Sequence, residues 1–324
     1  MKKVRKSLAY ALLLTMILCL IPACRPAEDP ASKKLSIVTT VFPIYDWTRE
    51  IAGNAENVEI TYLLDHSVDM HSYQPTVQGI ASIAAADLVI YVGGESDEWM
   101  ADALSKATNP KQKALNLMEV LGNAALEEEW AEGMAGGPEP GETEYDEHVW
   151  LSLRNAELFV QVISKAVQEL DPAKKQEFEA RTEAYLEKIR ALDAKYRAAA
   201  ESAAAKALVF ADRFPFLYLV KDYGIPYYAA FSGCAADSEA SFETVAFLAK
   251  KIDELGLKTI LVIETSDRRL ADTVRQTTSK KDQEILMMHS IQSVSAGEVQ
   301  AGFTYLDAME ENLKTLEKAL RTAE

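Results

Sequence analysis

Short apolar runs alternate with amphipathic stretches after residue 34. The runs are rich in Val, Ile and Leu and are bounded by turn or polar residues, as is typical of strands buried in a sheet. We predict strands at 35–41, 58–64, 87–92 and 114–120. Helices are predicted between them at 44–52 and 77–85. This alternation of strands and helices favours a mostly parallel sheet.

A second alternating block occupies the C-terminal third of the chain. Its predicted strands are 207–211, 225–230, 258–263 and 284–288. Its predicted helices are 215–222, 242–255, 268–278 and 305–320. Each block therefore predicts an α/β lobe with a mostly parallel sheet, although no internal sequence repeat relates the two blocks.

The segment between the two blocks has a different character. Gly122–Glu147 is rich in Glu and Gly and has little apolar periodicity, so we interpret it as a mobile acidic loop. Helical periodicity returns at 155–170. Asp171 and Pro172 then favour a helix start, and no Gly or Pro follows until about residue 204. A helix of about 30 residues is roughly 45 Å long. It predicts a stiff connector between the lobes, with an ordinary packed helix or a coiled coil as the alternative.

The N-terminus has the pattern of a secretory signal. Four basic residues within the first six precede an apolar run at 8–21. This run is short for a membrane-spanning helix, and its basic residues flank it at one end only. The following Leu20-Ile21-Pro22-Ala23-Cys24 resembles a bacterial lipobox, although Pro22 is unusual there. In a lipobox the cysteine becomes the lipid-modified first residue, so Cys24 is the candidate lipidation site. The alternative is an ordinary signal peptide with an incidental cysteine.

These patterns together predict a domain order. It comprises a signal peptide at 1–23, a lipid-anchored tether at 24–34, an N-terminal lobe at 35–171, a connecting helix at 172–204 and a C-terminal lobe at 205–324. The acidic loop at 122–147 falls inside the N-terminal lobe.

Charge and cysteine content narrow the possible functions. The net charge of −16 argues against nucleic-acid binding and against adhesion to anionic lipid. Cys19 and Cys24 fall in or beside the signal, so only Cys234 remains and the mature domain has no disulfide framework. No nucleophile elbow, phosphate loop or dinucleotide fingerprint occurs, which favours a binding protein over an enzyme.

Four histidines occur in the chain, and three of them follow predicted strands. His66 and His71 follow the strand at 58–64, His289 follows the strand at 284–288, and His148 ends the acidic segment. Ligands of open α/β sheets bind outside the carboxyl ends of strands, and imidazole is the commonest protein ligand for zinc. The chain has no H-E-x-x-H or C-x-x-C motif, so this pattern alone leaves metal binding open.

Two segments carry a family resemblance. Residues 69–76, DMHSYQPT, resemble the D-x-H-x-Y-x-P-T segment of the zinc- and manganese-specific solute-binding proteins of ABC importers, the metal-binding cluster A-I family. Residues 145–152, YDEHVWLS, resemble the D-x-H-V-W-L segment of the same proteins. The similarity extends from about Leu35 to the C-terminus. It implies two α/β lobes joined by one rigid helix, with a metal ion in the cleft.

The resemblance also implies ligands. On the first lobe these are His71 and His148. The second lobe usually supplies a His or Glu just after its first strand and an acidic residue near a later strand end. Here the first of these positions falls near Arg213, whose guanidinium cannot ligate a metal ion.

Other second-lobe residues are therefore considered as ligands. We rank His289 first, Glu264 second and Asp212 third, and Glu264 has a competing role as an ion-pair partner of Arg213. Cys234 is also possible, but an unpaired cysteine is more often a small buried hydrophobe. We expect His66 to lie at the rim.

The sequence thus predicts an extracytoplasmic, lipid-anchored and monomeric receptor that captures Zn²⁺ and delivers it to an ABC transporter permease. Imidazole-rich sites favour zinc, whereas carboxylates and water favour Mn²⁺. The alternatives are a manganese or iron receptor of the same type, or a surface adhesin or extracellular metalloenzyme on the same scaffold.

Overall fold

The computed structural model describes residues 34–53, 55–66, 68–135, 144–234 and 240–321. Leu35–Glu324 forms one compact unit. The predicted signal peptide and Cys24 lie outside the described residues. Within the part of the chain that is described, no helix is both long enough and apolar enough to cross a membrane.

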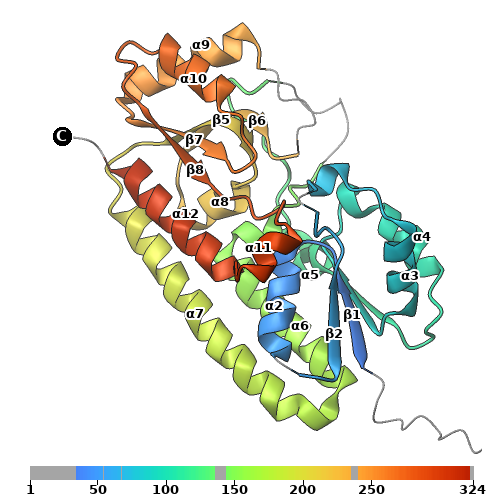
Figure 1. Cartoon of the computed structure of the whole chain (residues 1–324). Coiled ribbons are helices and arrows are strands. Elements are labelled where there is room, and N and C mark those ends of the chain that lie inside the picture. The colour runs from blue at the N-terminus through green and yellow to red at the C-terminus, as the bar shows by residue number, and fades with distance from the viewer. Residues whose placement is uncertain (1–33, 54, 67, 136–143, 235–239, 322–324) are drawn as a thin grey trace, which may run out of the picture. The chain divides into compact units, whose positions relative to one another are not determined.

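The first lobe is built on a four-stranded parallel sheet in the order β2-β1-β3-β4 (Figure 1). Its strands are β1 (Leu35–Thr39), β2 (Val58–Tyr62), β3 (Leu88–Tyr91) and β4 (Lys113–Asn116). Its helices are α2 (Phe42–Ala52), α3 (Val77–Ala85), α4 (Trp99–Ser105), α5 (Leu117–Leu121) and α6 (Leu153–Leu170). The strand predicted at 114–120 is wrong beyond Asn116. The Asn116 side chain accepts the Glu119 N–H and caps α5, so the chain turns into a helix there.

The second lobe repeats this topology with the parallel order β6-β5-β7-β8. Its strands are β5 (Leu208–Phe214), β6 (Tyr227–Ser232), β7 (Thr259–Ile263) and β8 (Glu284–Met288). Its helices are α8 (Leu217–Tyr223), α9 (Phe242–Leu255), α10 (Arg269–Thr277), α11 (Ala296–Gln300) and α12 (Tyr305–Leu320). The prediction of two α/β lobes with parallel sheets is therefore confirmed. Because the two sheets share one strand order, each strand of the first lobe has an equivalent in the second.

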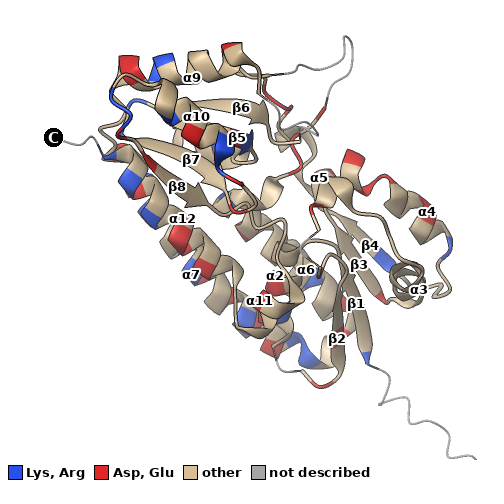
Figure 2. Cartoon of the chain, turned by 45° about the horizontal axis from the view of Figure 1, so that its top comes forward, with Lys and Arg blue, Asp and Glu red and all other residues tan. Residues whose placement is uncertain are grey.

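The predicted long helix is also confirmed. A 3-10 turn at Pro172–Lys174 leads into α7 (Lys175–Glu201), which contains no Gly or Pro. One face of α7 buries an apolar stripe formed by Phe178, Tyr185, Leu186, Ile189, Leu192 and Tyr196. Figure 2 shows acidic and basic residues interspersed along α7 and α12.

The last helix connects the second lobe to the first. In sequence α12 follows the second sheet, yet it packs against both α7 and α2 (Figure 1). The hydroxyl of Tyr196 donates to the Met309 carbonyl at 2.7 Å, and the Tyr305 N–H donates to the buried Asp46 carboxylate at 2.8 Å. These contacts brace the two lobes along a common helical layer.

The described residues of Gly122–Glu147, which are 122–135 and 144–147, make specific contacts, and the interpretation of the segment as a mobile acidic loop stays a prediction. Glu127 and Tyr145 form an antiparallel bridge, and the Ala135 N–H donates to the Ala230 carbonyl of β6 at 2.8 Å. Glu129 pairs with Lys221 of α8 at 2.5 Å. The acidic side chains thus find partners on the second lobe, which the lack of apolar periodicity could not indicate. Residues 136–143 lie outside the described residues.

Candidate metal centre

His71 lies on a 3-10 turn, Met70–Ser72, between β2 and α3. The Asp69 carboxylate caps this turn by accepting the backbone N–H of His71 at 3.1 Å. Nδ1 of the His71 ring lies 2.8 Å from the Ser96 hydroxyl, which belongs to the turn after β3. These two contacts fix both the backbone and the ring of His71.

His148 is fully buried and precedes the 3-10 turn Val149–Leu151. Asp146 Oδ1 accepts the backbone N–H of His148 at 2.7 Å and lies 3.2 Å from Nδ1 of the same ring. An ionised carboxylate can only accept, so it favours a proton on Nδ1 and leaves the lone pair on Nε2.

The two imidazoles meet at their Nε2 atoms, which are 3.3 Å apart. Two Zn–N bonds of about 2.0–2.1 Å at a tetrahedral angle would place their nitrogens about 3.3 Å apart. His71 and His148 therefore have the separation that one zinc ion bound by both would require.

A third possible ligand comes from the second lobe. Within the described residues, the cluster of His, Cys, Asp or Glu side chains suited to a metal ion consists of His71, His148 and Cys234, with their ligand atoms all within 4.8 Å of one another. Cys234 follows β6 by two residues, and its N–H donates to Glu128 Oε1 at 3.2 Å.

Buried carboxylates surround this cluster. Asp146 and Glu147 are almost completely buried, and one oxygen of each accepts no hydrogen bond from the described residues. Burial, with the charge of Asp146, raises the pKa of Glu128 to about 7. Burial also raises the pKa of Glu147. Negative charge in so poorly solvated a place is stabilised by a nearby cation.

The pKa values of the two rings shift in opposite directions. Burial opposes a charge on His148, but Asp146, Glu128 and Glu147 together raise its pKa above the usual value. Burial and the neighbouring His148 lower the pKa of His71 to about 3. His71 is therefore neutral at any physiological pH, and a proton on the pair resides on His148.

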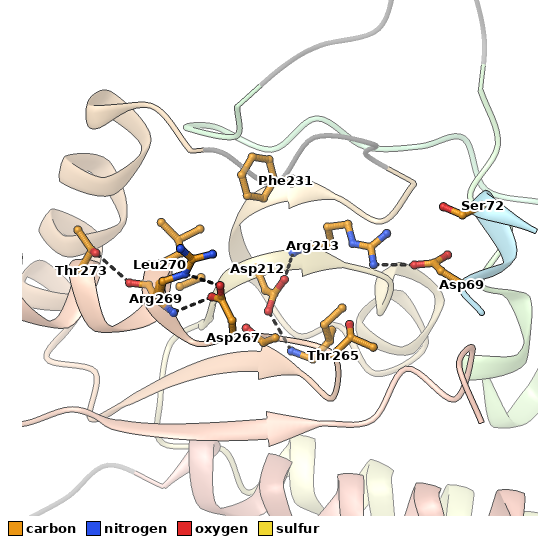
Figure 3. Close-up of a pocket in the computed structure, with 13 residues that line it drawn as sticks. Asp69, Ser72, Asp212, Arg213, Phe231, Thr265, Asp267, Arg269, Leu270 and Thr273 are labelled. Atoms are coloured by element: carbon orange, nitrogen blue, oxygen red, sulfur yellow. Dashed lines mark hydrogen bonds and ion pairs between the residues drawn. The ribbon is translucent and has the colours of Figure 1, made fainter. Parts of the chain in front are cut away.

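Arg213 and Gln292 reach the first lobe from the second. Arg213 pairs with Asp69 at 2.7 Å (Figure 3). Gln292 Nε2 donates to the same carboxylate oxygen at 3.1 Å. Gln292 Oε1 lies 3.0 Å from Nε2 of His148. The suggested pairing of Arg213 with Glu264 is wrong, because Asp69 is the carboxylate that balances the guanidinium. This ion pair lies at the edge of a pocket of about 690 Å³ between the lobes.

Comparison with known proteins identifies the family. Residues 37–319 match the family described as the periplasmic zinc-uptake complex component A, ZnuA. The chain belongs to the ZnuA family. Its two histidine-containing segments, 69–76 and 145–152, and its two-lobed fold agree with this membership.

Two curated relatives show how far the similarity extends. The zinc-binding lipoprotein AdcA of Streptococcus pneumoniae is 31% identical over 325 residues, which cover 98% of this chain and 61% of AdcA. The chain thus spans less than two thirds of that relative. The high-affinity zinc uptake system protein ZnuA of Bacillus subtilis is 28% identical over 306 residues, 93% of this chain and 94% of the relative.

A solved structure extends the comparison to the fold. The Zn(II)-bound ZnuA-like domain of Streptococcus pneumoniae AdcA superposes with a TM-score of 0.70 at 28% identity. The match covers 89% of this chain and 99% of that domain.

The second-lobe residues ranked highest from the sequence form a separate network. Glu264 accepts hydrogen bonds from the N–H and the hydroxyl of Ser290 at 2.7 and 2.6 Å. His289 Nδ1 accepts the Ile291 N–H at 2.9 Å and lies 3.4 Å from Glu264. Neither residue belongs to the described cluster around His71. Their assignment as ligands in this ZnuA-family chain stays a prediction.

Asp212 and His66 also have other surroundings. Asp212 accepts the backbone N–H groups of Arg213 and Ile263 at 2.9 and 3.3 Å. The His66 side chain is 81% exposed, which agrees with its expected place at the rim.

Sequence reasoning gave Cys234 little weight and did not consider Gln292, yet the structure places both near the histidine pair. Both follow the carboxyl ends of second-lobe strands, β6 and β8, which is the rule that singled out the histidines. Applying that rule to all polar side chains, rather than to histidines first, would have identified both residues.

Proposed function

We propose that this chain is an extracytoplasmic receptor that captures Zn²⁺ and delivers it to the permease of an ABC importer. The observation that carries the proposal is the 3.3 Å separation of the His71 and His148 Nε2 atoms among buried carboxylates. The relatives named for zinc binding and zinc uptake support the same function. His71 and His148 are the proposed first-lobe ligands, and the chain acts as a carrier rather than an enzyme.

Zinc is favoured over manganese by the chemistry of the site. Two imidazoles are borderline-soft ligands that suit zinc, whereas manganese prefers carboxylate and water oxygens. His289, Glu264 and Asp212 remain sequence-based candidates for the second lobe, but their hydrogen bonds within that lobe favour a bracing role.

Lipid attachment at Cys24 and a monomeric state complete the proposal. The relative AdcA is named a lipoprotein, and the Leu20–Cys24 segment has the lipobox pattern. Cys24→Ala should release the chain from the membrane fraction or leave it unprocessed. Wild-type protein that is released without an acyl group on its N-terminus would contradict the anchor.

The test of metal capture is direct. The purified full-length chain should retain about one zinc ion and should prefer zinc when zinc and manganese are supplied at equal free concentrations. His71→Ala and His148→Ala should each lower zinc affinity by at least tenfold. His66→Ala, which removes an exposed imidazole, is the matched control and should change nothing. Preferential retention of manganese would overturn the metal assignment.

A further inference from the structure

Cys234 occupies a position in the second lobe that matches His71 in the first. β2 and β6 are the second strands of two sheets with the same order, and each is followed by one of these residues. Both strands run parallel to their neighbours, so both side chains lie at the carboxyl edge of a sheet, where ligands of this fold class bind.

The backbone at Gly233, directly before Cys234, lies close to the His148 ring. A Cβ atom on Gly233 would lie 2.9 Å from the Phe214 carbonyl oxygen and 3.1 Å from Nδ1 of His148. The first distance is shorter than real Cβ contacts to a backbone oxygen, and the second is tighter than most Cβ contacts. The absence of a side chain at Gly233 therefore lets the turn after β6 bring Cys234 close to His148.

We infer that the Cys234 thiolate is the metal ligand from the second lobe, which makes the centre a site of two imidazoles and one sulfur. The inference rests on the proposed function, since it names a further ligand for the same ion. A zinc ion bound by all three groups would separate each nitrogen from the sulfur by about 3.6 Å, from Zn–S and Zn–N bonds of about 2.3 and 2.0–2.1 Å. The ligand atoms already lie within 4.8 Å of one another, so a small adjustment closes the site.

The buried acids favour a cation at this place. Burial and the charges of Asp146, Glu128 and Glu147 raise the pKa of the Cys234 thiol, so the thiolate forms together with the bound cation. A cysteine that serves only as a small hydrophobe packs among apolar side chains. Cys234 instead contacts Glu128 through its backbone and shares its surroundings with Asp146 and Glu147, whose free oxygens are buried. When the metal binds, the S–H bond breaks, the proton leaves to solvent and the sulfur electron pair forms the metal bond. No group is oxidised or reduced.

The other second-lobe residues near the pair cannot supply an anionic ligand. Arg213 is a cation held by Asp69, and Gln292 is a neutral amide that is shared between Asp69 and His148. Cys234 is consequently the one group from the second lobe, within the described residues, that joins the cluster. A thiolate also favours zinc over manganese, because sulfur is a soft ligand.

X-ray absorption at the zinc edge tests the inference on the full-length chain kept under reducing conditions. We expect one sulfur at about 2.3 Å and nitrogens or oxygens at about 2.0–2.1 Å. The Co²⁺-loaded chain should show a thiolate-to-metal charge-transfer band. Cys234→Ser should abolish both sulfur signals and lower zinc affinity at least tenfold.

Ser72→Ala is the matched control, because Ser72 lies beside His71 and lines the adjacent pocket without belonging to the cluster. It should leave the sulfur signals and the affinity unchanged. The wild-type spectrum requires no variant, so it decides the question even if Cys234→Ser folds poorly. Zinc bound only through nitrogen and oxygen would overturn the inference while leaving zinc capture intact. A wild-type chain that binds no zinc would overturn both proposals.

Discussion

Asp146 Oδ1 lies 3.2 Å from Nδ1 of His148 and also accepts the backbone N–H of the same residue. The carboxylate thereby sets the orientation of the ring and the nitrogen that carries the proton. Oxygen partners of this kind raise the basicity of a ligating histidine. The geometry of the His71–His148 pair therefore depends on a residue that need not touch the metal.

Asp146→Asn should lower zinc affinity by about 10–100-fold, the usual cost of losing such a partner. The amide preserves the size of the side chain but removes its negative charge. Competition titration with a chromogenic chelator measures the effect. Asp102→Asn removes an exposed carboxylate from α4 and controls for net charge. Equal affinity in both variants would show that Asp146 has no role in positioning His148.

The pH dependence of zinc binding should be dominated by His148 rather than by His71. The nearby carboxylates outweigh the effect of burial and raise the pKa of His148, whereas the pKa of His71 is lowered to about 3. A histidine must be neutral to ligate, so His148 releases a proton on binding only below its own pKa. The slope of a plot of log affinity against pH should therefore increase by about one as the pH falls through the pKa of His148, which is raised from its usual value of 6.5. Calorimetry in buffers of different ionisation enthalpy counts the protons. An identical proton count at pH 8 and pH 6 would contradict the assignment.

The buried Asp97 predicts a pH dependence of stability. Its Oδ2 accepts the N–H groups of Val92 and Gly93 at 3.0 and 3.1 Å, yet burial and the charge of Glu147 raise its pKa to about 7. The folded chain therefore holds this proton more tightly than the unfolded chain. The stabilisation is full below the ordinary value of 3.8 and is lost as the pH rises through 7. Its slope cannot exceed about 1.4 kcal/mol per pH unit.

Asp97→Asn should remove this dependence while keeping an acceptor for the two N–H groups. The free energy of unfolding of the variant, relative to that of the wild type, should be higher at pH 8 than at pH 5. Urea unfolding in the presence of a chelator measures the difference without interference from metal. Parallel losses at both pH values would mean that Asp97 is already ionised in the folded chain.

Much of the fold could be predicted from the sequence, because buried strands and amphipathic helices leave strong local patterns. The helices at 242–255 and 305–320 agree with α9 and α12 to the residue. The failure at Leu117–Leu121 arose where a single capping side chain overrode an apolar run that suited either a strand or a helix. The contacts of the acidic segment could not be predicted for a different reason, since they depend on partners in the other lobe.

The site was less predictable than the fold. His71 and His148 belong to recognisable segments, and the structure brings them together. Cys234 and Gln292 come close to them only through the relative placement of two sheets, which no local pattern records. The preference for His289 reflected residue type, since imidazole is a common ligand, and could not anticipate that the ring accepts a backbone hydrogen bond.

His289→Ala should lower stability more than zinc affinity. The ring accepts the N–H of Ile291, a buried β-branched residue held at φ 63°, where such residues are rarely found. Loss of this hydrogen bond to a buried group should cost about 1–3 kcal/mol. Thermal unfolding and zinc titration of the same preparation separate the two effects. A loss of affinity of tenfold or more, with stability unchanged, would instead support His289 as a ligand.

The lobes should move little when zinc binds or leaves. The helix α7 contains no Gly or Pro, and α12 packs along both α7 and α2, so the connection has no obvious hinge. Contacts between the lobes add further restraint: Tyr62 donates to the Val294 carbonyl at 2.8 Å, and Trp150 Nε1 donates to the Ser290 carbonyl at 2.8 Å. Small-angle scattering curves with zinc and with chelator should therefore nearly coincide. Tyr62→Phe removes one of these contacts without changing the ring, so it should increase any difference between the two curves. A large compaction of the wild-type chain on adding zinc would show that the helical layer bends. In that case zinc capture would require the lobes to close, and the short distances among His71, His148 and Cys234 would describe the closed form.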